Sequence, residues 1–501
     1  MVILISMDHG ASFKRKRKLS RREALSTAAK VGIGVVVAGA LGGVAGYLAG
    51  STAAPPKTVT SVVTSTVERV KTVTQTVTQK VTTPVTTEVT PTTTTVVTYT
   101  PKTEIKGELN IYTPSWGFDG TNEVVKLFQE EYPNVKVNVI RGPSTWDEHV
   151  TRTTVWMREK YSGVDVLYED DVFSLDGAVA GVWERLDDYV PKSIINDFSD
   201  LTKHFMELHG GLYRIPWGEG GSCLYYRKDI LEEEGQTVPK TWDELVEVGK
   251  ILTEDLDGDG KIDRYGYVTQ GTPGELYNTY NEFLHQAGGD EWTLAPGGAP
   301  EPKAKKALEF LVDLELKHKI MPPGITSVGY TESRAMLKEG KAVMLRDWGD
   351  VGRIVLTEWK MGDKIAAALF PAGDAGHWAI GHQWGWVVNK YGKNKDIAIE
   401  FVLFCLRPEV HKILGYYYQL PCRKSLYEDA EYMEMLAREN ITNVIADDLR
   451  KWFFPRKFPP GHATEYHEVF GRELTPALTG EISVDEALIR VQKAIDPLLP
   501  K

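Results

Sequence analysis

From Glu108 onward the chain alternates short apolar runs with amphipathic stretches, a pattern typical of strands followed by helices. Glu108–Tyr112, Val135–Ile140 and Val164–Asp170 are predicted strands. The segments between them, residues 121–133 and 145–163, carry apolar residues at helical spacing. This β-α-β-α-β order predicts a parallel sheet with right-handed crossovers, in which ligands bind beyond the carboxyl ends of the strands.

The same α/β pattern continues to the C-terminus. Thr241 and Glu244 form a predicted capping box at the start of a helix, and Trp242 is expected to pack that helix onto its sheet. No segment of 20–50 residues repeats, which excludes a solenoid or a propeller. The predicted helices cover residues 241–255, 302–319, 330–341, 395–414 and 483–499, and the predicted strands cover residues 341–348, 364–373 and 384–390.

Residues 1–50 have a different character, because a strongly basic run precedes the apolar segment Val31–Gly50. This is the layout of an export signal. Arg21 and Arg22 resemble a twin-arginine signal, but Ala24 stands where phenylalanine is usual, so a general secretory route stays open. The apolar segment is also long enough to cross a bilayer with its basic flank in the cytoplasm. We therefore predict either a cleaved signal or a retained membrane anchor.

Residues 51–106 form a low-complexity segment, with 21 threonines between Ser51 and Thr103. This composition is typical of a disordered linker or of an extended, O-glycosylated stalk. A stalk requires something anchored at one end. The segment therefore favours a retained anchor and a body held at the outer face of the cell membrane.

Charge and cysteine content exclude several classes of function. Residues 107–501 carry 44 basic and 64 acidic residues, which argues against a nucleic-acid partner. The three cysteines are too few for a disulfide framework. A bridge between Cys405 and Cys422 and a set of buried free thiols that includes Cys223 both stay open.

Five strings at familiar separations resemble the extracellular solute-binding proteins of ABC importers, in the group that includes maltose-binding protein. The resemblance extends over residues 107–501 and implies two α/β lobes that close on a ligand by a hinge motion. It also implies a monomeric receptor that delivers its solute to an ABC permease in the membrane. The strings are residues 164–190, 212–245, 333–349, 384–404 and 478–496. The implied lobes are residues 107–218 with 384–428, and residues 219–383 with 429–501.

The 13 tryptophans and 22 tyrosines suit a sugar ligand, because flat rings stack on pyranose faces while polar side chains bond the hydroxyl groups. A peptide or another polar solute stays open. Trp348 is the strongest candidate, since it matches a position where a sugar-stacking tryptophan occurs in the family. The predicted ligand-binding residues are Trp116, Glu169, Asp170, Trp217, Glu219, Asp347, Trp348, Gln383, Trp384 and Arg423.

A run of aspartates and glycines at residues 255–263 is similar to the start of an EF-hand loop. Gly260 occupies the position where that loop needs glycine, but Gly266 stands where it needs a bidentate glutamate. Similar loops occur in the family, and some bind calcium. A structural Ca²⁺ site and a plain Asp/Gly turn both stay open. The predicted ligands are Asp255, Asp257, Asp259, Lys261 and Asp263.

The chain lacks the common catalytic and cofactor motifs. It contains no GxSxG, HExxH, P-loop or dinucleotide fingerprint, and no pair of carboxylates stands out as an acid and a nucleophile. We therefore expect no cofactor and no catalysis. A secreted carbohydrate-active hydrolase is the alternative.

Overall fold

The computed structural model describes residues 66–67, 70–74, 95–99 and 105–501. The chain divides into two compact units, Met1–Thr100 and Pro101–Lys501. The predicted export signal and most of the predicted stalk lie outside the described residues, and no helix within the described part is long and apolar enough to cross a membrane. Three strands of the first unit pair antiparallel in chain order: β1 (Thr66–Val67), β2 (Val70–Thr74) and β3 (Thr95–Tyr99).

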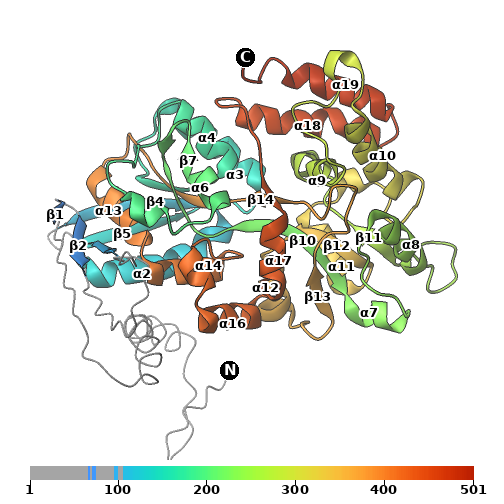
Figure 1. Cartoon of the computed structure of the whole chain (residues 1–501), viewed down its shortest axis with the longest axis horizontal. Coiled ribbons are helices and arrows are strands. Elements are labelled where there is room, and N and C mark those ends of the chain that lie inside the picture. The colour runs from blue at the N-terminus through green and yellow to red at the C-terminus, as the bar shows by residue number, and fades with distance from the viewer. Residues whose placement is uncertain (1–65, 68–69, 75–94, 100–104) are drawn as a thin grey trace, which may run out of the picture. The chain divides into compact units, whose positions relative to one another are not determined.

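The first sheet of the larger unit contains the three strands predicted near its start. The strand order is β5-β4-β6-β15-β9; β4, β5 and β6 are parallel, and β15 runs antiparallel to β6 and β9. Helices α2 and α3 connect the parallel strands, which confirms the predicted β-α-β-α-β order (Figure 1). The bounds are β4 (Gly107–Thr113), α2 (Phe118–Glu131), β5 (Val135–Arg141), α3 (Trp146–Glu159), β6 (Val166–Asp170), β9 (Arg214–Pro216) and β15 (Trp384–Val388).

The second sheet is mixed, with the strand order β11-β12-β10-β14-β16 and with β13 paired to β10. In Figure 1 helices α8, α9, α10, α18 and α19 lie on the right of the view, on the same side of the larger unit as β11 and β12. The strands are β10 (Gly220–Arg227), β11 (Tyr265–Val268), β12 (Ala342–Trp348), β13 (Ile365–Ala368), β14 (Ala379–His382) and β16 (Phe453–Pro455). The helices are α8 (Trp242–Leu252), α9 (Pro273–Gln286), α10 (Pro302–Leu316), α11 (Tyr330–Glu339), α18 (Ala463–Leu478) and α19 (Val484–Ile495).

The single helix predicted over residues 395–414 is wrong, because the chain forms two helices there, α13 (Lys395–Cys405) and α14 (Pro408–Tyr417). Pro408 is compatible with the first turn of α14, where an N–H has no helical partner anyway, but its ring would break the interior of a longer helix. The remaining short elements are α4 (Asp171–Val179), α5 (Lys192–Ile195), α6 (Asp200–Met206), β7 (Glu207–Leu208), β8 (Gly211–Leu212), α7 (Lys228–Glu233), α12 (Val351–Ile354), α15 (Lys424–Tyr427), α16 (Ala430–Glu439) and α17 (Ala446–Trp452).

Helix α8 begins much as its sequence predicts. The Thr241 hydroxyl accepts a hydrogen bond from the Glu244 N–H at 3.2 Å. The Glu244 carboxylate reaches back to the N–H of Lys240, one residue before the expected partner, at 2.7 Å. Trp242 stacks on Phe310 with ring centroids 4.2 Å apart. Phe310 belongs to α10, so Trp242 packs α8 against a neighbouring helix rather than onto the sheet as predicted.

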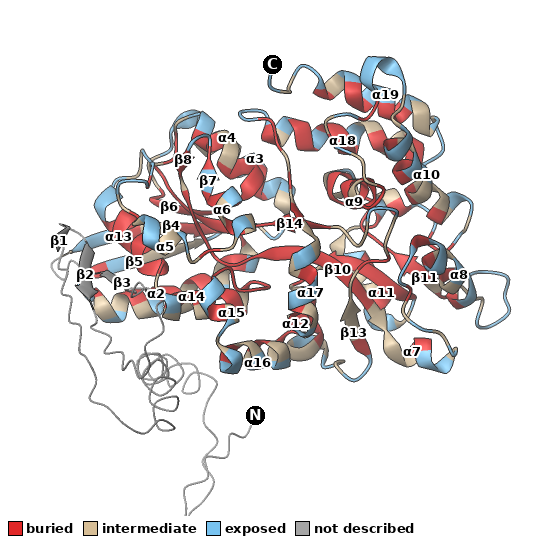
Figure 2. Cartoon of the chain, in the orientation of Figure 1, coloured by how far each residue is buried: buried red, intermediate tan, exposed pale blue. Residues whose placement is uncertain are grey.

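Each sheet has its own hydrophobic core, and Figure 2 shows the strands of both sheets as mostly buried. Tyr112, Leu167 and Val387 belong to the first core. The second core includes residues from β10, β12 and β14. All three cysteines are buried free thiols, so the Cys405–Cys422 bridge does not form in this structure.

The chain passes between the two sheets at crossings that are close to the predicted lobe boundaries. The first crossing links β9 to β10 through residues 217–219, and the second links β14 to β15 through Gln383. The third, residues 418–429, runs from α14 to α16 and is hydrogen-bonded to the first through a bridge between Glu219 and Leu420.

Candidate ligand-binding site

Two predicted tryptophans meet at the carboxyl edge of the first sheet. Trp116 follows β4, Trp384 begins β15, and their ring centroids lie 5.2 Å apart in an edge-to-face arrangement. Trp116 is 41% exposed, whereas Trp384 is 8% exposed. His149 of α3, which the sequence analysis missed, lies 6.0 Å from Trp116 and 5.5 Å from Trp384. The three rings form an aromatic cluster at the place where a parallel sheet binds ligands.

Glu169, at the end of β6, is the buried carboxylate of this cluster. Its Oε2 contacts His149 Nε2 at 2.9 Å, while Oε1 has no hydrogen-bond partner among the described residues. Tyr112 holds the other ring nitrogen of His149 through its hydroxyl at 3.2 Å. Burial raises the pKa of Glu169, although His149 opposes that change. This oxygen is a buried acceptor left unsatisfied by the described residues, and its contact with a ligand stays a prediction.

Asp170 is occupied by protein partners. Its two carboxylate oxygens accept hydrogen bonds from the Phe173 N–H and from Trp146 Nε1, each at 2.8 Å. It is therefore the N-cap of α4. Burial raises the pKa of Asp170 despite the nearby Arg456. A contact between Asp170 and a ligand stays a prediction.

Trp348 lies at the end of β12, on the second sheet. Its indole N–H donates to the Tyr330 hydroxyl at 2.5 Å, and its ring centroid lies 4.3 Å from that of His382. The Arg346 guanidinium lies 4.4 Å from the ring centroid and pairs with the buried Glu282 at 2.8 Å. The Trp348 side chain is partly exposed and fixed by three neighbours, as a stacking platform requires.

Asp347, the neighbour of Trp348, is fully buried and paired. Both of its oxygens accept hydrogen bonds from Arg334, at 2.8 and 2.9 Å. Asp347 therefore holds the Trp348 segment to α11, while its contact with a ligand stays a prediction.

Two residues that the sequence analysis missed connect the two sheet edges. The Trp384 N–H donates to the Tyr418 hydroxyl at 3.1 Å. That hydroxyl also lies 3.1 Å from Nδ1 of His382, which contacts Trp348. Burial lowers the pKa of His382 well below its usual value, so the imidazole is neutral. His382 directly precedes the predicted Gln383, and this neighbourhood is the one feature of the sequence that could have indicated His382. Nothing in the pattern singled out Tyr418.

The other four predicted residues lie at or beside the crossings and have protein partners. Trp217 is buried against Tyr168, with ring centroids 4.2 Å apart. Arg423 donates to Asp197 at 2.6 Å and to a backbone carbonyl. Glu219 and Gln383 are both hydrogen-bonded to the Thr202 hydroxyl, at 2.9 and 3.2 Å. The structure therefore brings Trp116, Glu169 and Trp384 together, and places these four in the connection between the sheets.

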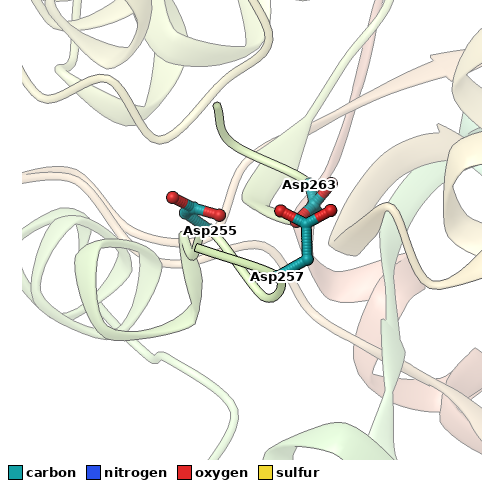
Figure 3. Close-up of side chains that lie close together, drawn as sticks. All are labelled: Asp255, Asp257 and Asp263. Carbon is teal, nitrogen blue, oxygen red and sulfur yellow. The ribbon is translucent and has the colours of Figure 1, made fainter. Parts of the chain in front are cut away.

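Three of the five predicted calcium ligands come together in the loop between α8 and β11. Carboxylate oxygens of Asp255, Asp257 and Asp263 lie within 4.8 Å of one another, and all three residues are exposed (Figure 3). Hydrogen bonds from backbone N–H groups, that of Gly260 foremost, lower the pKa of Asp255.

The two other predicted calcium ligands pair with each other. The Asp259 carboxylate accepts from the Lys261 N–H at 2.8 Å and contacts Lys261 Nζ at 3.2 Å. These contacts occupy both of its oxygens within the loop.

Several known proteins are similar to this chain in sequence or in structure. A mannitol-binding protein of Pseudomonas aeruginosa is 23% identical over 74% of this chain and 87% of its own length. An arabinooligosaccharide-binding protein of Halalkalibacterium halodurans is 23% identical over 66% of this chain and 77% of its own. The structure of maltose-bound MalE3 from T. maritima superposes with a TM-score of 0.68 at 26% identity, covering 78% of this chain and all of that one.

These likenesses confirm the predicted two-lobe α/β fold, and they are to binding proteins rather than to enzymes. Residues 118–412 match the family described as bacterial extracellular solute-binding protein. The matched range begins in α2 and ends in α14, so it includes strands of both sheets and the first two crossings. The chain belongs to the bacterial extracellular solute-binding protein family.

Proposed function

We propose that this chain captures a sugar or oligosaccharide between its two lobes and delivers it to an ABC permease, without catalysing a reaction. The observation that carries the proposal is the pair of aromatic edges. Trp116 and Trp384 end the first sheet, Trp348 ends the second, and Tyr418 and His382 connect them. The free Glu169 oxygen adds an acceptor for a hydroxyl group. Relatives named for mannitol and arabinooligosaccharide binding support the same ligand class.

The lobes of this proposal are residues 107–218 with 384–428, and residues 219–383 with 429–501. The strand membership of the two sheets supports this division. Rotation about the three crossings would bring the aromatic edges together around the ligand and exclude water from it. Affinity then comes from ring stacking and hydroxyl hydrogen bonds that form only in the closed arrangement.

Calorimetry tests the binding proposal. The purified chain is titrated with mannitol, maltose and arabino-oligosaccharides, and each mixture is then analysed for products by chromatography. We expect one ligand per chain for at least one sugar and no new product after prolonged incubation. Release of shorter sugars would establish a hydrolase instead, and binding of peptides but no sugar would overturn the ligand class.

We further propose that the body works as a monomer at the outer face of the cell membrane. Residues 31–50 would anchor it and residues 51–106 would act as the stalk. The extracellular family supports export. Fractionation of cells that express the full chain tests the anchor: the body should sediment with membranes, and deletion of residues 31–50 should release it.

The loop of Asp255, Asp257 and Asp263 is proposed to bind a structural Ca²⁺. Three carboxylates this close repel one another, and a cation bound between them would relieve that repulsion beyond what the backbone N–H groups on Asp255 do. We expect millimolar calcium to raise the melting temperature by about 2 °C, the effect of a site with submillimolar affinity in a chain of this size. Asp257→Asn should remove this rise, whereas Asp259→Asn should keep it. An unchanged melting temperature in the unsubstituted chain would exclude the site.

A further inference from the structure

A buried chain of hydrogen bonds connects the three crossings. Arg214 Nη2 donates to Gln383 Oε1 at 3.0 Å, and Gln383 Nε2 donates to the Thr202 hydroxyl at 3.2 Å. Thr202 in turn donates to Glu219 Oε1 at 2.9 Å, and the Tyr427 hydroxyl donates to Glu219 Oε2 at 2.8 Å. The position of each side chain in this series of hydrogen bonds therefore depends on that of the next. Glu219 supplies the only carboxylate in the series.

The backbone of Glu219 is fixed as firmly as its side chain. Its N–H donates to the Leu420 carbonyl at 2.9 Å, and the Leu420 N–H donates back to the Glu219 carbonyl at 3.0 Å. The residue is 2% exposed. Glu219 thus lies where the first crossing is hydrogen-bonded to the third. A change in its charge therefore alters the electrostatic environment of both crossings.

Arg450 approaches the Glu219 carboxylate from the side of the second sheet. It belongs to α17, which leads directly into β16 of that sheet, and its Nε lies 4.0 Å from Glu219 Oε2. Its Nη1 donates to Asp447 at 3.1 Å, while Nε and Nη2 have no hydrogen-bond partner among the described residues. Two buried donors of a permanent cation are therefore available close to the Glu219 carboxylate.

Tyr427 belongs to a segment that is held to the first sheet's side. Its neighbour Ser425 donates to Asp197 at 2.7 Å, in the segment between α5 and α6, and α6 contacts β9. The Arg450 guanidinium lies 3.0 Å from the centroid of the Tyr427 ring. Glu219, Tyr427 and Arg450 together therefore form a polar contact between the two lobes, directly beside the crossings.

We propose that Glu219 is a positioning residue of the hinge: ionised, it attracts Arg450 and favours the lobe arrangement seen here, and protonated, it releases Arg450. If the chain binds its ligand between the lobes, as proposed above, ligand affinity then depends on pH. The sequence analysis had assigned Glu219 to the ligand. In this structure both of its carboxylate oxygens accept hydrogen bonds from protein side chains, Thr202 and Tyr427.

The charge of Glu219 changes in the neutral range, because burial raises its pKa from 4.5 to about 7, against the effects of Tyr427 and Arg450. Three neighbouring groups, Tyr427, Cys422 and His411, stay neutral in this pH range. Burial raises the pKa of Tyr427 and of Cys422 well above their usual values, so both stay neutral. Burial also lowers the pKa of His411, which contacts the Trp217 backbone, well below its usual value. Glu219 is therefore the group here that titrates near pH 7.

The test measures the lobe arrangement of the full chain without any ligand. Paramagnetic labels are placed on exposed residues of the two lobes through Glu130→Cys and Lys493→Cys, and the label distance is recorded from pH 5.5 to 8.5. The three native thiols are buried and are not expected to react. We expect the distance distribution to change with a midpoint near pH 7. No change across this range would overturn the proposal.

Two variants test whether Glu219 and Arg450 cause the change of label distance with pH. Glu219→Gln cannot ionise, so its distance distribution should stay that of low pH, and Arg450→Gln, which removes the attracted cation, should also lose the transition. Glu291→Gln is the matched control, because burial raises the pKa of Glu291 to about 8 while its carboxylate accepts from Tyr277 of α9 rather than from a residue of the crossings. A transition that persists in Glu219→Gln, or disappears in Glu291→Gln, would overturn the proposal.

A second readout follows from linkage and requires no ligand either. The raised pKa means that the contribution of Glu219 to folding stability is full below pH 4.5 and is lost as the pH rises through about 7. The melting temperature of the parent chain should fall over this range relative to that of Glu219→Gln. Because neither readout uses a sugar, failure to bind sugars would contradict only the proposed function, whereas sugar binding with a pH-independent label distance would contradict only the hinge proposal.

Discussion

Replacing Trp348 by alanine is expected to weaken sugar binding about 100-fold while the fold stays intact. A sugar stacked on the indole buries about 100 Å² of apolar surface, which at about 25 cal/mol per Å² is about 2.5 kcal/mol, or close to two factors of ten in affinity. The ring is held in place by its hydrogen bond to Tyr330 and its contact with His382. Calorimetry with the sugar that binds the parent chain measures the loss.

Trp378→Ala provides the matched control. Trp378 is also partly exposed and also donates its indole N–H within the protein, to the Ala375 carbonyl at 3.0 Å. Trp378 lies directly before the start of β14, whereas the crossing at Gln383 follows the end of that strand. Trp378→Ala therefore changes the end of β14 that is away from the aromatic edges. We expect its affinity to stay within twofold of the parent chain. Equal affinities for the two variants would remove Trp348 from the site.

The sequence predicted the elements because their apolar patterns are local. The three parallel strands of the first sheet could be derived from three apolar runs and two helical stripes, and their carboxyl ends pointed to Trp116 and Glu169. Trp384 begins the antiparallel strand β15, and its place beside Trp116 follows only from the strand pairing. Trp348 follows the same logic on β12. For such residues the position after a strand is enough, because strand direction fixes the edge at which they lie.

The rest of the site depends on contacts that no local pattern records. His149 points from a helix that looks like any amphipathic helix, and its role appears only through Glu169 on a strand 20 residues away. Tyr418 is one of three consecutive tyrosines, and only the crossing geometry selects it. The sequence predicts Glu219 and Arg423 as ligand contacts. Tertiary partners satisfy both, which loop chemistry alone could not reveal.

A buried ion pair across the lobes carries the largest expected effect on stability. Asp171 begins α4, directly after β6 of the first sheet, and Arg456 follows β16 of the second sheet; their side chains are 2% and 6% exposed. Arg456 Nε donates to Asp171 Oδ2 at 2.9 Å, and Nη2 donates to the other oxygen. Close by, Asp176 accepts from the N–H groups of Ala463 and Thr464, which caps α18 from the opposite lobe. The pair is thus part of a continuous contact between the lobes.

Arg456→Met should lower the free energy of unfolding by about 3–5 kcal/mol, because it leaves the Asp171 carboxylate buried without its partner. Lys306→Met, which breaks the exposed pair with Asp374, should cost less than about 1 kcal/mol. Urea unfolding of the purified chain measures both. The double variant Asp171→Asn/Arg456→Met removes both charges and should recover most of the loss. If Arg456→Met cost no more than Lys306→Met, the two charges would not be paired in solution, and the contact between α4 and the segment before α18 would differ from the one described here.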